Sequence, residues 1–266
     1  MKIEGRNVLV TGGSSGIGLA TAQALLARGA RVFITGRRAE ALQQALTQLR
    51  GAGKAHGVIA DVATAAGRVY TLQAALEAMG GLDILVNNAG GVRAGRLEET
   101  AEADIRAMIE VNLAAPILLA RAALPSLRAG GGMIVNISSG IALVGVPFYT
   151  TYAAVKAGVA HFGEALRREL KGEGVHVMTV YPAATDTPMM QSSRAGPDLG
   201  FVREPAAVVA QAIIDGIESE ALQVVRGGDT RAAMIAQNRT DPGALDQRFV
   251  GLKPALAEAV RDHSAL

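Results

Sequence analysis

The feature that most constrains this 266-residue chain is the regular alternation of short apolar runs with longer helical stretches. Six clear runs and a weaker seventh cover residues 7–12, 31–36, 55–62, 82–90, 131–140, 174–183 and 221–228. Strands that are apolar on both faces and separated by helices are typical of a parallel sheet covered on both sides. Because crossovers between parallel strands are right-handed, the sequence predicts a doubly wound α/β fold with about seven strands.

The rest of the chain contains no Pro/Ser-rich linker and no internal repeat, so residues 1–266 are expected to form one domain. Residues 185–205 are the longest stretch without a regular pattern, and a loop of that length predicts a functional cover over a site. Residues 229–266 are a C-terminal extension of unclear role. Within it, residues 252–263 have the pattern of a final amphipathic helix.

Composition excludes several classes of function. The chain has no cysteine, which excludes disulfides, thiolate nucleophiles and cysteine-based zinc sites. Its four histidines share no ligand spacing, so no metal site is predicted. Lys and Arg total 26 against 24 Asp and Glu, with no basic run and no Trp, which argues against nucleic-acid binding. The first residues lack a signal-peptide core, and no apolar run approaches the roughly 20 residues of a membrane span. A soluble cytoplasmic protein is therefore expected.

A glycine-rich turn, TGGSSGIG at residues 11–18, follows the first predicted strand and opens the first predicted helix. Its glycines permit a backbone that a Cβ would block, and the helix N-terminus offers N–H groups to a pyrophosphate. The nucleotide-binding residues predicted here are Gly12, Ser14, Ser15, Gly16, Ile17 and Gly18. The spacing is GxxxGxG rather than GxGxxG, and an ordinary strand-to-helix turn is the alternative.

The end of the second predicted strand indicates which dinucleotide binds. An acidic residue at this point would bind a ribose 2′-hydroxyl. Here the sequence has Arg37 and Arg38, whose guanidiniums can pair with a 2′-phosphate. NADP(H) is therefore favoured and NAD(H) is possible, unless the two arginines only start a solvated helix. Asp61, followed by Val62, is expected to meet the adenine edge or to cap the next helix.

Tyr152 and Lys156 are four residues apart in a helical stretch, which places them on one face, one turn apart. A tyrosine ordinarily keeps its proton until about pH 10. A neighbouring ammonium favours the phenolate, so Lys156 is expected to lower the pKa of Tyr152 toward neutrality and make it a usable acid and base. The alternative is a surface helix pair.

Several motifs in sequence order resemble those of the short-chain dehydrogenase/reductase family: TGGSSGIG, DV at 61–62, NNAG at 87–90, VNL around Asn112, ISSG and YAAVK at 152–156. The resemblance extends over residues 5 to 190. It implies a single Rossmann-type domain that binds NAD or NADP and transfers hydride between nicotinamide and a ketone or secondary alcohol.

The resemblance also implies roles for individual residues. It implies the catalytic tetrad Asn112, Ser139, Tyr152 and Lys156, in which Ser139 is preferred over Ser138 because it lies 13 residues before Tyr152. Further cofactor contacts implied are Asn88, Ala89, Gly90, Tyr152, Lys156, Pro182, Thr185 and Thr187. The family often has Pro-Gly where this chain has Pro182-Ala183, and alanine accepts a positive φ less readily than glycine.

The leading prediction is an NADPH-dependent carbonyl reductase or the reverse alcohol dehydrogenase, acting on a small-molecule substrate. The residues expected to form an apolar substrate pocket are Ile141, Val144, Tyr149, Met189 and Met190. A 3-oxoacyl thioester, a steroid-like ketone and a small aliphatic ketone remain open as substrates. A non-enzymatic nucleotide-binding regulator on the same fold is the alternative function, and a sugar epimerase or dehydratase is disfavoured by the glycine spacing. Helices that are apolar all round, at 105–124 and after Tyr152, are expected to be buried on every side, by a second subunit or by the long loops. The family resemblance implies a homodimer or homotetramer formed through these two helices.

Overall fold

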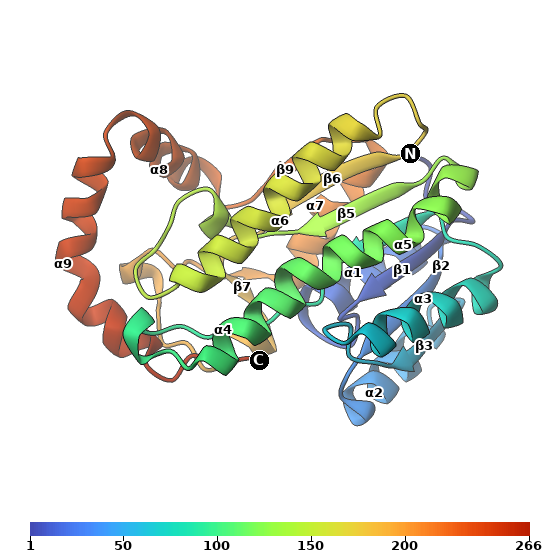
Figure 1. Ribbon diagram of the computed structural model, residues 1–266, viewed down its shortest axis with the longest axis horizontal. Helices are drawn as coiled ribbons and strands as arrows, with labels where there is room; N and C mark the ends of the chain where they lie inside the picture. Colours follow the sequence, from blue (N-terminus) through green and yellow to red (C-terminus); the bar gives the residue numbers. More distant parts are fainter.

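The computed structural model describes all 266 residues and contains the parallel sheet that the apolar runs predict (Figure 1). The seven strands lie in the order β3-β2-β1-β4-β5-β6-β9, and every pairing is parallel. Their bounds are β1 (Asn7–Thr11), β2 (Arg31–Gly36), β3 (Ala55–Ile59), β4 (Ile84–Asn87), β5 (Met133–Ile137), β6 (His176–Tyr181) and β9 (Gln223–Val225). The order reverses between β1 and β4, which is where such sheets bind ligands at their carboxyl ends.

Helices cover both faces of the sheet. One layer consists of α1 (Gly16–Ala27), α2 (Ala39–Arg50) and α7 (Ala206–Glu218). The other consists of α3 (Ala65–Met79), α4 (Glu102–Ile109), α5 (Ala115–Gly130) and α6 (Thr150–Glu169). Two layers of helices are needed because both faces of the strands are apolar and must be covered.

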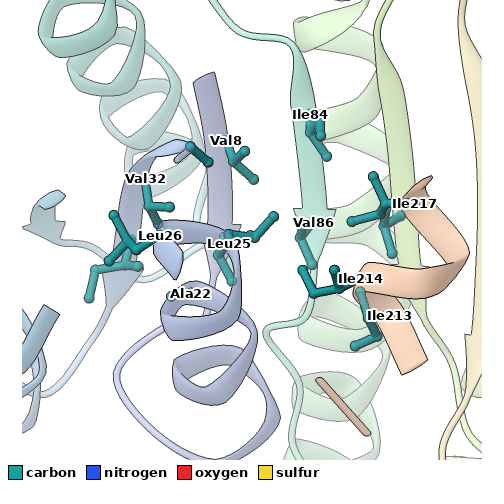
Figure 2. Packing of buried hydrophobic residues seen from close by; sticks show 14 of the residues in the cluster. Val8, Ala22, Leu25, Leu26, Val32, Ile84, Val86, Ile213, Ile214 and Ile217 are labelled. Carbon is teal, nitrogen blue, oxygen red and sulfur yellow. The ribbon is translucent and has the colours of Figure 1, made fainter. Parts of the chain in front are cut away.

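Successive side chains of β1 point to opposite faces of the sheet and pack into two separate hydrophobic cores. Val8 and Val10 point into the core under α1, α2 and α7, whereas Leu9 between them points into the core under α3, α5 and α6. Figure 2 shows Leu25 of α1 and Ile213 of α7 converging on β1 and β4 from one side. All five of these side chains are fully buried, and burial of each contributes roughly 1.5–3 kcal/mol.

The segment 185–205 is less irregular than its sequence predicts. Two-residue strands, β7 (Thr185–Asp186) and β8 (Glu204–Pro205), pair in parallel at its ends. Two 3₁₀ turns, Pro188–Met190 and Pro197–Leu199, lie between them. Both turns begin at proline, whose fixed φ suits a first helical position.

The C-terminal extension forms two helices, α8 (Gly228–Thr240) and α9 (Pro242–Val260). The sequence predicted only the later part of α9, and α8 was not predicted. Figure 1 shows the pair at one end of the molecule, beyond α6 and away from α2 and α3. Leu256, Ala259 and Val260 of α9 then pack into a third, smaller core that includes Val92 and Tyr149.

One helical run, Glu102–Gly130, is long and apolar enough to cross a membrane, with a mean hydropathy of 1.6 over its best 18-residue window. Arg106, Glu110 and Arg121 interrupt this run, so it contains no uninterrupted apolar stretch of about 20 residues. A π-helical turn, Glu110–Ala114, interrupts the run between α4 and α5. Because Leu119, Ala123 and Leu127 of α5 are buried in the core shared with α3 and α6, the run has the features of a core helix.

Candidate active site

A single cleft of about 1010 Å³ runs along the carboxyl ends of the strands. It joins the glycine-rich turn at one end to Tyr152 and Lys156 at the other. The predicted site residues that line it are Gly12, Ser14, Ser15, Gly16, Ile17, Arg37, Arg38, Asp61, Val62, Asn88, Ala89, Gly90, Ser139, Ile141, Tyr149, Tyr152, Lys156, Pro182, Thr185, Thr187, Met189 and Met190. Motifs separated by more than a hundred residues are thus brought to one surface.

Three predicted site residues do not line the cleft. Gly18 lies beneath the glycine-rich turn, and Asn112 is buried behind Gly91. Val144 was wrongly predicted to line the substrate pocket: its side chain is 1% exposed, and Val146 lines the cleft instead. Both valines lie in the irregular segment between the 3₁₀ turn Gly140–Ala142 and α6, where no regular repeat predicts which side chain faces the cleft.

The glycine-rich turn is held by Asn88 at the end of β4. The Asn88 Nδ2 donates to the carbonyl oxygens of Thr11 and Gly12 at 2.9 and 3.1 Å. Gly12 and Gly16 adopt positive φ values of 64° and 54°, which favour glycine. A Cβ on Gly18 would lie 2.4 Å from both the Asn88 amide and the Gly12 carbonyl. The turn therefore needs these three glycines to have its shape.

The same turn fits a pyrophosphate. Ser15 precedes α1 as its N-cap, but its side chain makes no capping hydrogen bond. Helix N-termini carry a positive dipole end and attract phosphate. Arg37 and Arg38, at the end of β2, are exposed, line the cleft and form no ion pair. The carboxylate of Asp61 accepts the N–H of Ala63 at 2.9 Å, whereas Thr64 caps α3, so Asp61 is not the helix N-cap.

Tyr152 and Lys156 lie one turn apart on α6, as their spacing predicts. The Lys156 Nζ lies 5.6 Å from the centre of the Tyr152 ring and donates to the Ile137 carbonyl at 3.0 Å. Ser138 is buried and donates to the Lys156 carbonyl at 2.7 Å. The Ser139 hydroxyl lies at the cleft and accepts from the Ile141 N–H at 3.4 Å. Both serines line the cleft, but the Ser138 hydroxyl is bonded to the backbone, so Ser139 remains the proposed catalytic serine.

In the protein without cofactor, burial has the largest effect on the pKa values of Tyr152 and Lys156. Desolvation, with a smaller effect from Tyr149, raises the pKa of Tyr152, and the nearby Ser139 side chain opposes the shift. Desolvation lowers the pKa of Lys156 to about 8. The expectation that Lys156 lowers the pKa of Tyr152 does not hold for this state, because the ammonium is itself destabilised by burial.

Asn112 lies in the π-helical turn and fixes the loop that follows β4. Its Nδ2 donates to the carbonyls of Gly91 and Met108 at 2.8 and 2.9 Å, and its Oδ1 accepts from the Gly91 N–H at 3.3 Å. A Cβ on Gly90 would lie 2.7 Å from Asn112 Oδ1 and 3.4 Å from Lys156 Nζ. Asn112 is therefore a positioning residue for the backbone opposite Lys156.

The segment after β6 accommodates alanine in place of glycine without strain. Ala183 is not among the residues with positive φ, so the Pro182-Ala183 pair needs no left-handed backbone. The hydroxyl of Thr185 is turned inward and donates to the Ala183 carbonyl at 2.9 Å. Thr187 packs against Gly16, where a Cβ would meet its methyl group at 3.0 Å.

Comparison with known proteins agrees with this geometry. The family model described as short chain dehydrogenase matches residues 6–198. The chain belongs to the short-chain dehydrogenase family. It is an NAD(P)-dependent oxidoreductase, the class of enzyme that transfers hydride between nicotinamide and a carbonyl or alcohol carbon. The matched residues include every strand of the sheet except β9.

Similar proteins include several oxidoreductases. The ketoacyl reductase HetN of Nostoc sp. is 34% identical over 256 residues, which cover 93% of this chain and 89% of that protein. The D-threitol dehydrogenase of Mycolicibacterium smegmatis is 34% identical over 239 residues, covering 86% and 91% respectively. A solved short chain dehydrogenase from Burkholderia cenocepacia in complex with NADP is 34% identical with a TM-score of 0.79, covering 86% of this chain and 98% of that one.

Residues from the C-terminal extension line the cleft of this short-chain dehydrogenase, and sequence reasoning missed them. They are Thr230, Arg231, Met234, Arg248, Phe249, Leu252, His263, Ala265 and Leu266. No motif marks them. The amphipathic pattern of α9 was the one available signal, and it indicates burial without saying against what.

The segment after α9 contacts both the loop after β4 and the segment 185–205. Ala265 pairs with Val92 through two backbone hydrogen bonds, at 2.8 and 3.4 Å. The His263 ring is 1% exposed, lies 3.0 Å from the Ser192 hydroxyl and stacks edge-on against Tyr149. Burial, helped by Arg203 and Arg93, lowers the pKa of His263 to about 4.

We expect this histidine to make the enzyme sensitive to mild acid. The unfolded chain binds a proton on His263 below its ordinary pKa of 6.5, whereas the folded chain does so only below about 4. Stability is therefore lost as pH falls through that window, by about 2 kcal/mol between pH 7 and pH 5. Urea unfolding at both pH values should give this loss for the wild type. The loss should be smaller by about that amount in His263→Gln, and an equal loss in both proteins contradicts the assignment.

Proposed function

We propose that this enzyme is an NADP(H)-preferring carbonyl reductase, or the reverse alcohol dehydrogenase, in which Tyr152 transfers the proton. The observation that carries the proposal is one continuous cleft with the glycine-rich turn at one end and Ser139, Tyr152 and Lys156 at the other. The residues of the turn fit the cofactor's phosphates. When bound, the nicotinamide supplies or accepts the hydride.

In the reductive direction negative charge develops on the carbonyl oxygen. Tyr152 donates its phenolic proton to that oxygen, and Ser139 donates a hydrogen bond that polarises it. The Lys156 ammonium, 5.6 Å from the centre of the same ring, attracts the phenolate that remains and opposes the effect of burial that dominates in the protein alone. Asn112 acts through Gly91, holding the loop that faces Lys156. In oxidation the same groups act in reverse.

A ketone panel tests this function. Purified enzyme is mixed with NADPH and aliphatic, cyclic, steroid-like and 3-oxoacyl ketones, and consumption of the reduced nicotinamide is followed by its absorbance. Turnover of at least one class with NADPH is expected. Tight nucleotide binding without turnover of any ketone, or of any secondary alcohol with NADP⁺, would favour the non-enzymatic regulator instead.

Cofactor preference should depend on Arg37. A guanidinium paired with the 2′-phosphate is worth about 10- to 100-fold in affinity, so wild type is expected to bind NADPH more tightly than NADH by that factor. Arg37→Asp should remove or invert the preference, measured as dissociation constants by quenching or calorimetry. Arg31→Asp is the matched control, because it makes the same charge change at the opposite end of β2. A wild type that prefers NADH contradicts the proposal.

We further propose that segment 185–205 covers the substrate, since Met189, Met190, Leu199 and Phe201 all face the cleft. Assembly as a homodimer or homotetramer is supported by apolar side chains left exposed on the α4–α5 run, including Ile109 and Leu118. Sedimentation analysis of the purified enzyme measures the assembly directly.

A further inference from the structure

Arg231 is a positively charged residue of the cleft, and no carboxylate forms an ion pair with it. It lies on α8, is half-buried and lines the cleft. It forms no ion pair, and the hydrogen bond of its side chain is a long one, from Nη1 to the Gly140 carbonyl at 3.5 Å. A guanidinium has five N–H donors, and a desolvated donor without an acceptor is costly. One of these five donors therefore has an acceptor within the protein, in a side chain that lines the cleft.

The position of Arg231 places it beside the reacting end of the site. Its guanidinium lies against Gly140, where a Cβ would meet Cζ at 3.2 Å and Nη2 at 3.3 Å. Gly140 directly follows Ser139 in the chain, so the guanidinium packs against the residue next to the proposed catalytic serine. Burial lowers the pKa of Arg231 but leaves it charged near neutral pH.

The charges around Arg231 do not compensate it. Glu204 also lines the cleft, but Arg226 binds its carboxylate at 2.7 Å and occupies it. Asp61 lies at the other end of the sheet, after β3. Arg248 of α9 is a second guanidinium that lines the cleft without an ion pair. Met234 of α8 and Leu252 of α9 add apolar side chains to the cleft lining.

We propose that Arg231 binds an oxyanion of the substrate, so that the enzyme acts on ketones or alcohols that carry a carboxylate or phosphate beyond the reacting carbon. This inference rests on the proposed function and specifies its substrate class. Arginine suits the purpose because its planar fork matches a carboxylate or phosphate with two parallel hydrogen bonds. The apolar side chains of the cleft lining accommodate the carbon chain between the ketone and the anion.

Matched pairs of neutral and anionic ketones test the proposal. The carboxylate arm compares 4-oxopentanoate and 5-oxohexanoate with their methyl esters. The phosphate arm compares 3-oxobutanoyl coenzyme A with its N-acetylcysteamine thioester, which lacks phosphate. Wild type is expected to prefer the anionic member of at least one arm by about 10- to 100-fold in kcat/KM. The arm with the preference identifies the source of the oxyanion.

Substitutions at position 231 assign the preference to this side chain. In Arg231→Met the ratio of kcat/KM for anionic to neutral ketone should fall by about 10- to 100-fold, mostly through KM, and Arg231→Lys should restore part of it. Arg239→Met is the matched control, because Arg239 lies exposed on the same helix and does not line the cleft. Its ratio should equal that of wild type.

Three results overturn the proposal: equal use of both members by wild type, an unchanged ratio in Arg231→Met, or weaker NADPH binding in that variant, which would assign Arg231 to the cofactor. If wild type turns over no ketone, calorimetric titration of each pair into the enzyme saturated with NADP⁺ decides instead. If anion binding then depends on Arg231, the oxyanion site is supported although the proposed function fails. Anion binding independent of Arg231 overturns the site as well.

Discussion

Replacing Tyr152 with phenylalanine is expected to lower kcat/KM for ketone reduction by about a thousand-fold, because a positioned proton donor contributes about 10²–10⁴-fold. The variant keeps the ring that lies 5.6 Å from Lys156 and loses the hydroxyl that we propose protonates the product oxygen. Because the lost interaction is made chiefly in the transition state, kcat should fall while KM changes little. Steady-state kinetics with the best ketone of the panel measures both constants.

Tyr149→Phe is the matched control for this result. Tyr149 precedes α6, lines the same cleft and has a buried hydroxyl without a hydrogen-bond partner. Burial raises the pKa of both tyrosines, but the residue one helical turn after Tyr149 is Ala153, so no lysine follows it as Lys156 follows Tyr152. Loss of the Tyr149 hydroxyl should cost less than about tenfold in kcat/KM, since no proton transfer is removed. Equal activity of wild type and Tyr152→Phe would show that another group carries the proton.

Local patterns were enough to predict most of this fold and much of its site. Strands such as β1 and β2 are apolar on both faces, a pattern that only a doubly covered parallel sheet satisfies. The glycine-rich turn and the four-residue step from Tyr152 to Lys156 are also local, and both occupy the cleft. The choice of Ser139 over Ser138 came from the family resemblance, through the 13 residues that separate Ser139 from Tyr152, and it stays a prediction.

Other features depend on contacts between distant residues and leave no local signal. Arg231 meets Gly140 across 91 positions in the chain, and the amphipathic pattern of α9 does not identify what covers its apolar face. The pKa of Lys156 was also beyond sequence reasoning. The four-residue spacing predicted the proximity of its ammonium to Tyr152, but the degree of burial decides which electrostatic effect dominates.

The second large effect is expected from Gly18, the predicted cofactor residue that does not line the cleft. Gly18→Ala places a Cβ 2.4 Å from both the Asn88 amide and the Gly12 carbonyl. Either the turn moves away or Asn88 releases its hydrogen bonds to Thr11 and Gly12. Overpacking and the loss of buried hydrogen bonds together should destabilise the protein by about 3 kcal/mol. Urea denaturation measures this loss.

NADPH affinity of Gly18→Ala shows whether Gly18 shapes the turn or only contributes to the stability of the fold. Because the displaced turn is the proposed phosphate site, the fraction of Gly18→Ala that remains folded should bind NADPH at least about tenfold more weakly, a loss of about 1.4 kcal/mol. Gly145→Ala is the control: its Cβ meets nothing within 4 Å, so stability and NADPH affinity should stay near wild type. If Gly18→Ala is as stable as Gly145→Ala, the turn is free to relax and the Asn88 clamp does not define its shape. If it is unstable yet binds NADPH normally, the turn recovers on binding, and its shape in the free enzyme is not what selects the cofactor.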